Sequence, residues 1–200
     1  MKTMMNFLAG AAMVLLPLFA VADATPPDVL VKNTANDVLA IIKSDKDIQA
    51  GDMRKITALA EEKILPQFDF NRMSRMVLGK YWAGATPDQQ KQFVDQFRSL
   101  LIRTYASALS KYRDQTIDYK PLRADPGATD VTVKTQINQP GGQPIPLDYS
   151  LIKNPDGWKV YDVVIEGLSL VTSYSGQFGP IAKQGGMDEM IRKLAEKDNQ

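Results

Sequence analysis

The side chains that could carry out chemistry in this chain are carboxylates, phenols, lysines and serines, because its 200 residues include no histidine and no cysteine. Zinc and copper sites, like Ser-His and Cys-His nucleophile pairs, normally need imidazole or thiolate, so the composition argues against them. Asp162 and Tyr149 both lie in apolar segments and could serve as general base and general acid toward a small apolar substrate. An enzyme with Asp/Tyr acid-base chemistry in a cone-shaped cavity is therefore one hypothesis.

The stretch 157–174, GWKVYDVVIEGLSLVTSY, would position Asp162. Its alternation predicts a strand with Trp158, Val160, Asp162 and Val164 on one face and Lys159, Tyr161, Val163 and Ile165 on the other. Both faces are largely apolar, so we expect protein or an apolar ligand against each of them. Glu166, beside Gly167, is predicted to cap the helix that follows.

Three further strands are predicted before this one, at residues 117–122, 131–137 and 145–151, where apolar residues alternate with polar ones. Proline- and glycine-containing turns separate them: DPG at 125–127, QPGG at 139–142 and NPDG at 154–157. Together the four segments predict an antiparallel meander.

Helical spacing of apolar residues predicts helices over 29–43 and 53–65, and a short helix between a capping Asp69 and Gly79, with Tyr81 and Trp82 in the loop that follows. The TPDQ sequence at 86–89 predicts the start of a long helix that reaches about residue 112. After residue 167 we expect a helix broken by Gly176 and by Gly179-Pro180, then a last helix over 187–197. Helices on both sides of a run of strands indicate an α+β fold.

The first 22 residues have the pattern of an export signal: Lys2, an apolar run over 7–19 and the small residues Ala20-Val21-Ala22. Cleavage near Ala22 would leave residues 23–200 as a single domain, which we expect in the periplasm. The 24 basic and 23 acidic residues are interspersed, so the sequence has no basic cluster that would indicate nucleic-acid binding. A phosphate-binding P-loop or dinucleotide fingerprint is also lacking in the sequence.

Three segments of the chain resemble the MlaC family, also called the toluene-tolerance auxiliary component of an ABC transporter. They are VLGKYWAGATPDQQKQFVDQFRSLLIRTYASAL at 77–109, IPLDYSLIK at 145–153 and the 157–174 stretch. Members are periplasmic phospholipid-binding proteins of lipid-trafficking systems. The resemblance implies a curved antiparallel sheet of about four strands, wrapped by N- and C-terminal helices around an apolar cavity (an NTF2-like cone).

The resemblance also implies a carrier rather than an enzyme, with phospholipid as cargo, no cofactor and no catalytic residue. Its partners would be an outer-membrane lipoprotein–porin complex and the inner-membrane MCE-type ring of an ABC permease, and its role the maintenance of outer-membrane lipid asymmetry. We expect a monomer. A ligand-free periplasmic adaptor with an exposed apolar patch is a further alternative.

The candidate lipid-binding residues are those where the faces of the helices and the sheet should converge. They are Leu78, Tyr81, Phe97, Leu101, Tyr105, Ile145, Leu147, Tyr149, Val164, Leu168 and Val171. A filled core would use the same residue types, so for each of them plain core packing is an equal interpretation.

Overall fold

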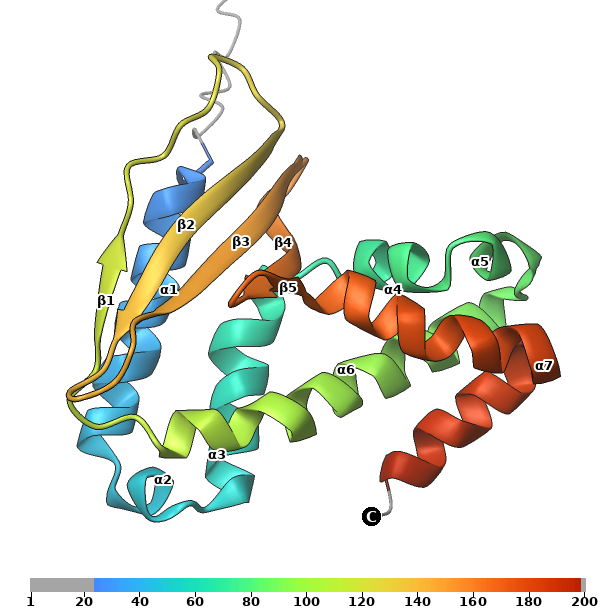
Figure 1. Ribbon diagram of the computed structural model, residues 1–200, viewed down its shortest axis with the longest axis horizontal. Coiled ribbons are helices and arrows are strands. Elements are labelled where there is room, and N and C mark those ends of the chain that lie inside the picture. The colour runs from blue at the N-terminus through green and yellow to red at the C-terminus, as the bar shows by residue number, and fades with distance from the viewer. Residues whose placement is uncertain (1–23, 199–200) are drawn as a thin grey trace, which may run out of the picture.

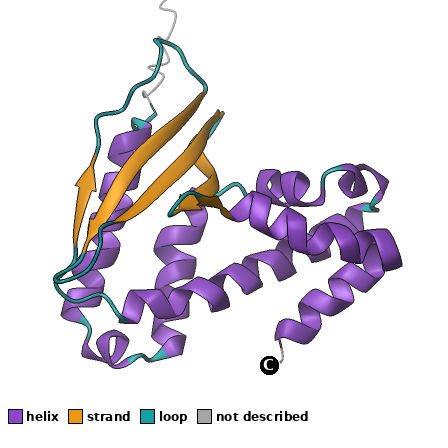
Figure 2. Cartoon of the chain, viewed as in Figure 1, coloured by secondary structure: helices purple, strands orange, loops and turns teal. Residues whose placement is uncertain are grey.

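The computed structural model describes residues 24–198, with side chains to residue 196, so the predicted export signal lies outside the described residues. The elements are α1 (Pro27–Ser44), α2 (Lys46–Ala50), α3 (Met53–Leu59), the π-helical η1 (Ala60–Ile64), the 3-10 helix η2 (Leu65–Gln67), α4 (Phe70–Leu78), α5 (Lys80–Gly84), α6 (Pro87–Ser110), β1 (Thr116–Tyr119), β2 (Asp130–Asn138), β3 (Ile145–Asn154), β4 (Gly157–Ile165), β5 (Leu168–Ser169) and α7 (Leu170–Asp198). Figures 1 and 2 show a curved sheet with helices behind and beside it, which confirms the α+β fold.

The sheet is an antiparallel meander in the order β1-β2-β3-β4-β5. Helix α1 runs along one face, which we call the inner face (Figure 1). Val31 of α1 packs there against Val131, Val133, Leu151 and Val160. This cluster fixes the register, because a slip of one residue would turn every apolar side chain to the outer face.

Because of a β-bulge in β4, the faces on which its residues lie differ from the predicted ones. Leu151 pairs with Val160 and Ser150 pairs with Asp162, so Tyr161 is an extra residue on β4. The bulge shifts the alternation by one residue, and therefore Val160 and Val163 both lie in the core of the inner face. The simple alternation, which placed these two residues on opposite faces, is wrong.

Helix α6 begins as its sequence predicts. The Thr86 hydroxyl accepts a hydrogen bond from the Gln89 amide, and the Gln89 side chain accepts one from the Thr86 amide, which forms a capping box. The helix packs on α7 through stacked and edge-on rings of Phe93, Phe97, Tyr174 and Phe178. Burial of these rings makes the junction of α4, α6 and α7 the first apolar core.

Two helical predictions differ from the structure. Tyr81 and Trp82 lie in α5 rather than in a loop. Helix α7 continues through Gly176 and Pro180, and its break lies at Gly186, where φ is 71°. The stripe of Val171, Tyr174, Phe178 and Ala182 packs into the first core, and this packing holds the helix together despite its weak helix formers.

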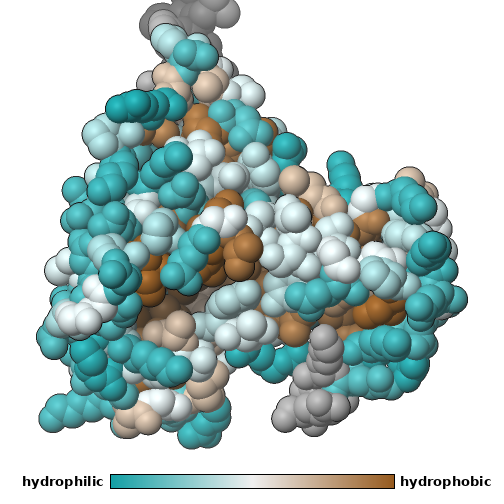
Figure 3. Space-filling view, viewed as in Figure 1, coloured by the Kyte–Doolittle hydropathy of each residue, from teal (hydrophilic) through white to brown (hydrophobic). Residues whose placement is uncertain are grey.

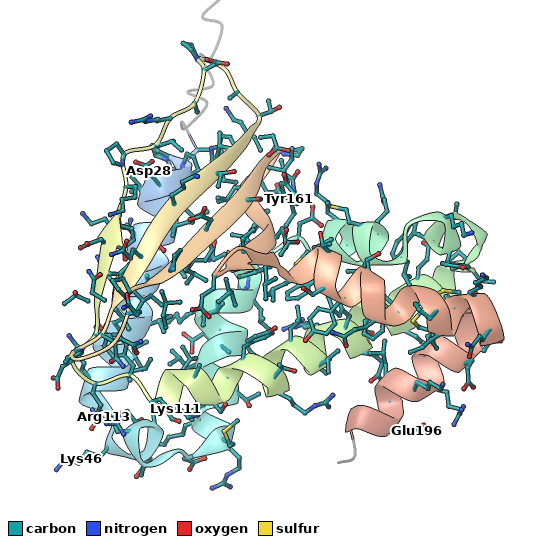
Figure 4. All side chains as sticks on the ribbon, in the orientation of Figure 1. Asp28, Lys46, Lys111, Arg113, Tyr161 and Glu196 are labelled. Carbon is teal, nitrogen blue, oxygen red and sulfur yellow. The ribbon has the colours of Figure 1, made fainter. Side chains whose placement is uncertain are left out.

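A second helical core joins α1, α3 and the C-terminal half of α6 through Val38, Ile42, Ile56, Leu59 and Ala106. Just past the end of α6, the Arg113 guanidinium, labelled in Figure 4, donates a hydrogen bond to the Gln49 carbonyl of α2. Short α2, which the sequence did not predict, is capped by the Asp45 carboxylate. The helices therefore form a continuous support beneath the sheet (Figure 1).

Candidate functional site

The inner face of the sheet is packed shut at one end and only partly covered at the other. On β3, Leu151 is 0% exposed, whereas Tyr149, Leu147 and Ile145 are each only half-buried. Strand β2 shows the same gradient, because Val133 is 1% exposed while Ile137 is half-buried. An apolar surface therefore remains partly exposed on the side of the sheet where a core is expected.

The helix on the inner face lies closest to one side of the sheet. The backbone of α1 comes close to that of β2, whereas the central strand β3 has its close backbone neighbours mainly in β2 and β4. Figure 3 shows a hollow with apolar side chains at its border, between the lower end of the sheet, α3 and α6. We call this space the hollow. At this end of the sheet, the half-buried apolar residues of β2, β3 and β4 that share the inner face are Ile137, Ile145, Leu147, Tyr149 and Ile165. We take these five residues as the wall of the hollow.

Tyr149 lies in the middle of this wall, and its side chain is half-buried. Burial, with a smaller effect from Tyr119, raises the pKa of its phenol. The ring therefore lies among protein groups while part of its surface stays open.

Asp162 has a structural role outside the hollow. Its Oδ1 accepts hydrogen bonds from the Val163 and Val171 amides at 2.8 and 3.1 Å, and its Oδ2 accepts one from the Ser169 hydroxyl at 2.6 Å. The Ser169 hydroxyl in turn accepts one from the Thr172 amide. Asp162 and Ser169 thus satisfy the free amides at the start of α7.

This arrangement separates the two groups of the enzyme hypothesis and corrects the predicted cap. Tyr149 pairs with Val163 and Ser150 with Asp162, so Tyr149 and Asp162 lie on opposite faces of the sheet. Glu166 does not cap α7. It has a φ of 51° and, with Gly167 at 84°, forms the two-residue turn between β4 and β5, where both residues have positive φ.

The structure divides the eleven predicted lipid-binding residues among three environments. Ile145, Leu147 and Tyr149 lie on the wall of the hollow. Leu78, Phe97, Leu101 and Val171 are buried in the first core, and Tyr81 packs against it. Tyr105 is 37% exposed, Leu168 is 70% exposed on β5, and Val164 pairs with Asp148 on the outer face.

Ile137 and Ile165 also belong to the wall but were absent from the prediction. Ile137 pairs with Ile145, and Ile165 pairs with Leu147. The pairing of adjacent strands was the available signal, because residues directly opposite each other share a face. For β4 this signal was hidden, because the β-bulge at Tyr161 changes which residues lie opposite those of β3.

Two clefts with charged residues at their borders lie elsewhere on the described chain. One, of about 400 Å³, is bordered by Phe68, Phe70, Arg98 and Lys159, and the other, of about 910 Å³, lies between the loop after β1 and strand β2, with Lys120 and Arg123 at its border. Among residues 24–198, no helix is both long enough and apolar enough to cross a membrane. The same residues contain no cluster of three or more metal-binding side chains.

These features define a class of protein: an α+β protein in which a curved sheet and its supporting helices flank an apolar hollow, an arrangement suited to an apolar ligand. The chain belongs to the MlaC family, because the family model described as MlaC protein matches residues 32–196. It is 29% identical to the toluene tolerance protein ttg2D of Pseudomonas putida over 189 residues, which cover 92% of this chain and 87% of that protein.

Two further relatives are informative. The intermembrane phospholipid transport system binding protein MlaC of Haemophilus influenzae is 26% identical over 179 residues, covering 88% of this chain and 84% of that protein. The structure of a phospholipid-binding protein from Ralstonia solanacearum, solved in complex with a phospholipid, matches with 45% identity and a TM-score of 0.82. That match covers 90% of this chain and 98% of the Ralstonia chain.

Proposed function

We propose that this protein is a periplasmic phospholipid carrier. It holds the acyl chains of a lipid in the hollow and shuttles the lipid between an outer-membrane and an inner-membrane complex, which maintains the lipid asymmetry of the outer membrane. The observation that carries the proposal is the half-buried apolar inner face of the sheet, together with the hollow beside its lower end. The close structural match to a protein solved with bound phospholipid supports it.

The physical need for such a hollow follows from the cargo. A diacyl lipid exposes about thirty methylenes to water when it leaves a bilayer, at roughly 0.8 kcal/mol each, so more than about 20 kcal/mol opposes its exit. An apolar wall such as Ile145, Leu147 and Ile165 offers the chains a surface that replaces part of the bilayer. Transfer through water then no longer requires full exposure of the chains.

The carrier would act without catalysing a reaction. The separation of Tyr149 from Asp162 by the sheet supports this reading, because an acid and a base must both reach the reacting atoms. We propose that it exchanges lipid with an outer-membrane lipoprotein–porin complex and with the MCE-type ring of an inner-membrane ABC permease. The protein would work as a monomer, after export directed by residues 1–22.

Lipid extraction tests the central proposal. The full chain is produced with its own export signal, purified from the periplasm without detergent, extracted with organic solvent and examined by mass spectrometry. We expect diacyl phospholipid in near-stoichiometric amounts. A protein that is folded by circular dichroism but carries no lipid, and takes up none from phospholipid vesicles, would contradict the proposal and favour an enzyme or an adaptor.

Transfer is tested separately from binding. Donor vesicles that contain a self-quenched fluorescent phospholipid are mixed with unlabelled acceptor vesicles, and the recovery of fluorescence is followed with and without the protein. We expect the protein to accelerate recovery in proportion to its concentration. Lipid binding without acceleration would indicate storage rather than shuttling.

A further inference from the structure

The inner face carries few polar side-chain groups, and most of those near the hollow are engaged by the protein itself. The Thr135 hydroxyl donates a hydrogen bond of 2.6 Å to the Leu147 carbonyl. Just past the end of α6, beside the second helical core, the Tyr112 hydroxyl donates to the Gln115 carbonyl. These groups are satisfied and have no need of a ligand.

Tyr149 differs from them. Within residues 24–196 its hydroxyl has no hydrogen-bond partner. The neighbouring Tyr119 hydroxyl also lacks one, but that atom is fully buried, whereas the Tyr149 hydroxyl keeps accessible surface. Tyr149 thus presents a free donor on the apolar inner face of the sheet.

The position of Tyr149 in the sheet makes this donor rigid. The residue lies in the middle of β3, paired with Val133 on one side and Val163 on the other, and both valines are buried. A phenol on a central strand loses little freedom when it forms a hydrogen bond. A donor left unpaired in an apolar site is unfavourable, so a ligand that brings an acceptor gains affinity there.

In a phospholipid, the acceptors joined directly to the acyl chains are the ester carbonyls. Resting on the proposed function, we infer that the Tyr149 hydroxyl donates a hydrogen bond to an acyl ester carbonyl of the bound lipid. The bond fixes how far the chains reach along the inner face. It also makes the site selective for ester-linked lipids over ether-linked lipids, which lack that carbonyl.

Matched lipids test the inference. Two phosphatidylcholines with the same chain length, one diester and one diether, compete against a fluorescent phospholipid for the wild-type protein, for Tyr149→Phe and for Tyr161→Phe. Tyr161 is the control because its hydroxyl bonds to Asp130 at 2.9 Å on the side of β4 away from α1 (Figure 4). Thermal unfolding verifies that each variant is folded.

We expect the wild type and Tyr161→Phe to prefer the diester by about 5- to 10-fold, the effect of one hydrogen bond. Tyr149→Phe should lose this preference by binding the diester more weakly, with its affinity for the diether unchanged. A wild-type protein that binds both lipids equally, or a Tyr149→Phe protein that keeps the preference, would overturn the inference alone. If the wild type binds neither lipid, the proposed function fails as well.

Infrared spectroscopy gives a readout that a purely structural role of Tyr149 would not change. With the ester carbonyls labelled with ¹³C, we expect one component of the bound lipid to shift to lower frequency in the wild type, since a hydrogen bond weakens the C=O stretch. That component should return to the unbonded frequency in Tyr149→Phe. A spectrum identical in the two proteins would overturn the inference.

Discussion

Asp162 Oδ1 lies 3.1 Å from the backbone nitrogen of Val171, so a carboxylate on β4 holds the first turn of α7. The same oxygen accepts from the Val163 amide, and the other oxygen accepts from the Ser169 hydroxyl. This buried group is the direct link between the sheet that forms one wall of the hollow and the helix that completes the first core. A negative charge at a helix N-terminus is also favourable to the helix dipole.

Replacement of Asp162 by alanine should lower the free energy of unfolding by about 2–4 kcal/mol, because two backbone amides and a hydroxyl lose a charged acceptor. Urea denaturation measures the change. Asp118→Ala is the matched control, since Asp118 is exposed on β1 and should change stability by less than about 0.5 kcal/mol. Equal effects at the two positions would contradict the role assigned to Asp162.

A charge on the wall of the hollow should remove the lipid without unfolding the protein. Leu147→Asp places a carboxylate on the half-buried inner face, where desolvation opposes both the charge and a neighbouring acyl chain. We expect lipid recovery by mass spectrometry to fall at least about tenfold. Pro146→Asp, one residue away on the exposed side, should retain its lipid. Loss of lipid in both variants would argue against the hollow as the site.

Phe97 belongs to the core of the helices, and its loss should affect stability more than lipid content. Its ring is 0% exposed and lies 5.3 Å from the Tyr174 ring and 5.7 Å from the Phe93 ring, centroid to centroid. Phe97→Ala should cost about 3–5 kcal/mol of stability, whereas Leu168→Ala, at a 70% exposed position, should cost little. A stable Phe97→Ala protein that has lost its lipid would place Phe97 in the site instead.

Ionisation of the Tyr105 phenol should make the free energy of unfolding depend on pH in the alkaline range. Burial, followed by the hydrogen bond with Tyr174, raises the pKa of Tyr105 to about 12. Because the folded protein holds this proton more tightly than the unfolded chain, the associated stability is present below about pH 10 and is lost as the pH rises toward 12. Denaturation at several pH values, with phenolate absorbance as the titration signal, should show a flatter decline for Tyr105→Phe. An unchanged profile would contradict the assignment.

The elements that follow from local chemistry could be predicted from the sequence. The Thr86-Gln89 capping box, the Asp69 cap of α4 and the strands separated by glycine turns depend on residues close together in the chain. The bulge at Tyr161 depends on the pairing of β3 with β4, and the continuity of α7 through Pro180 depends on its packing against α6. Neither feature can be predicted from the spacing of residue types along one segment, because both depend on contacts with another segment.

The wall of the hollow was predictable only in part, for a similar reason. Alternation placed Leu147 and Tyr149 on one face of a strand, where the structure leaves both half-buried, but Phe97 and Val171 carry the same apolar character and lie in a filled core. Whether a side chain meets another side chain or an open space depends on how far the helices stand from the sheet. The residue types alone do not predict that distance.

The half-buried inner face should make the thermal stability of the protein depend on whether a lipid is bound. Leu147 and Ile165 lose dispersion contacts wherever they face an unfilled space, so we expect the vacant form to have a lower melting temperature than a filled one. Any molecule that occupies the hollow and ignores the unfolded chain raises that temperature with the logarithm of its concentration. The melting curve of a freshly purified sample should therefore also report the fraction of protein molecules that carry a lipid.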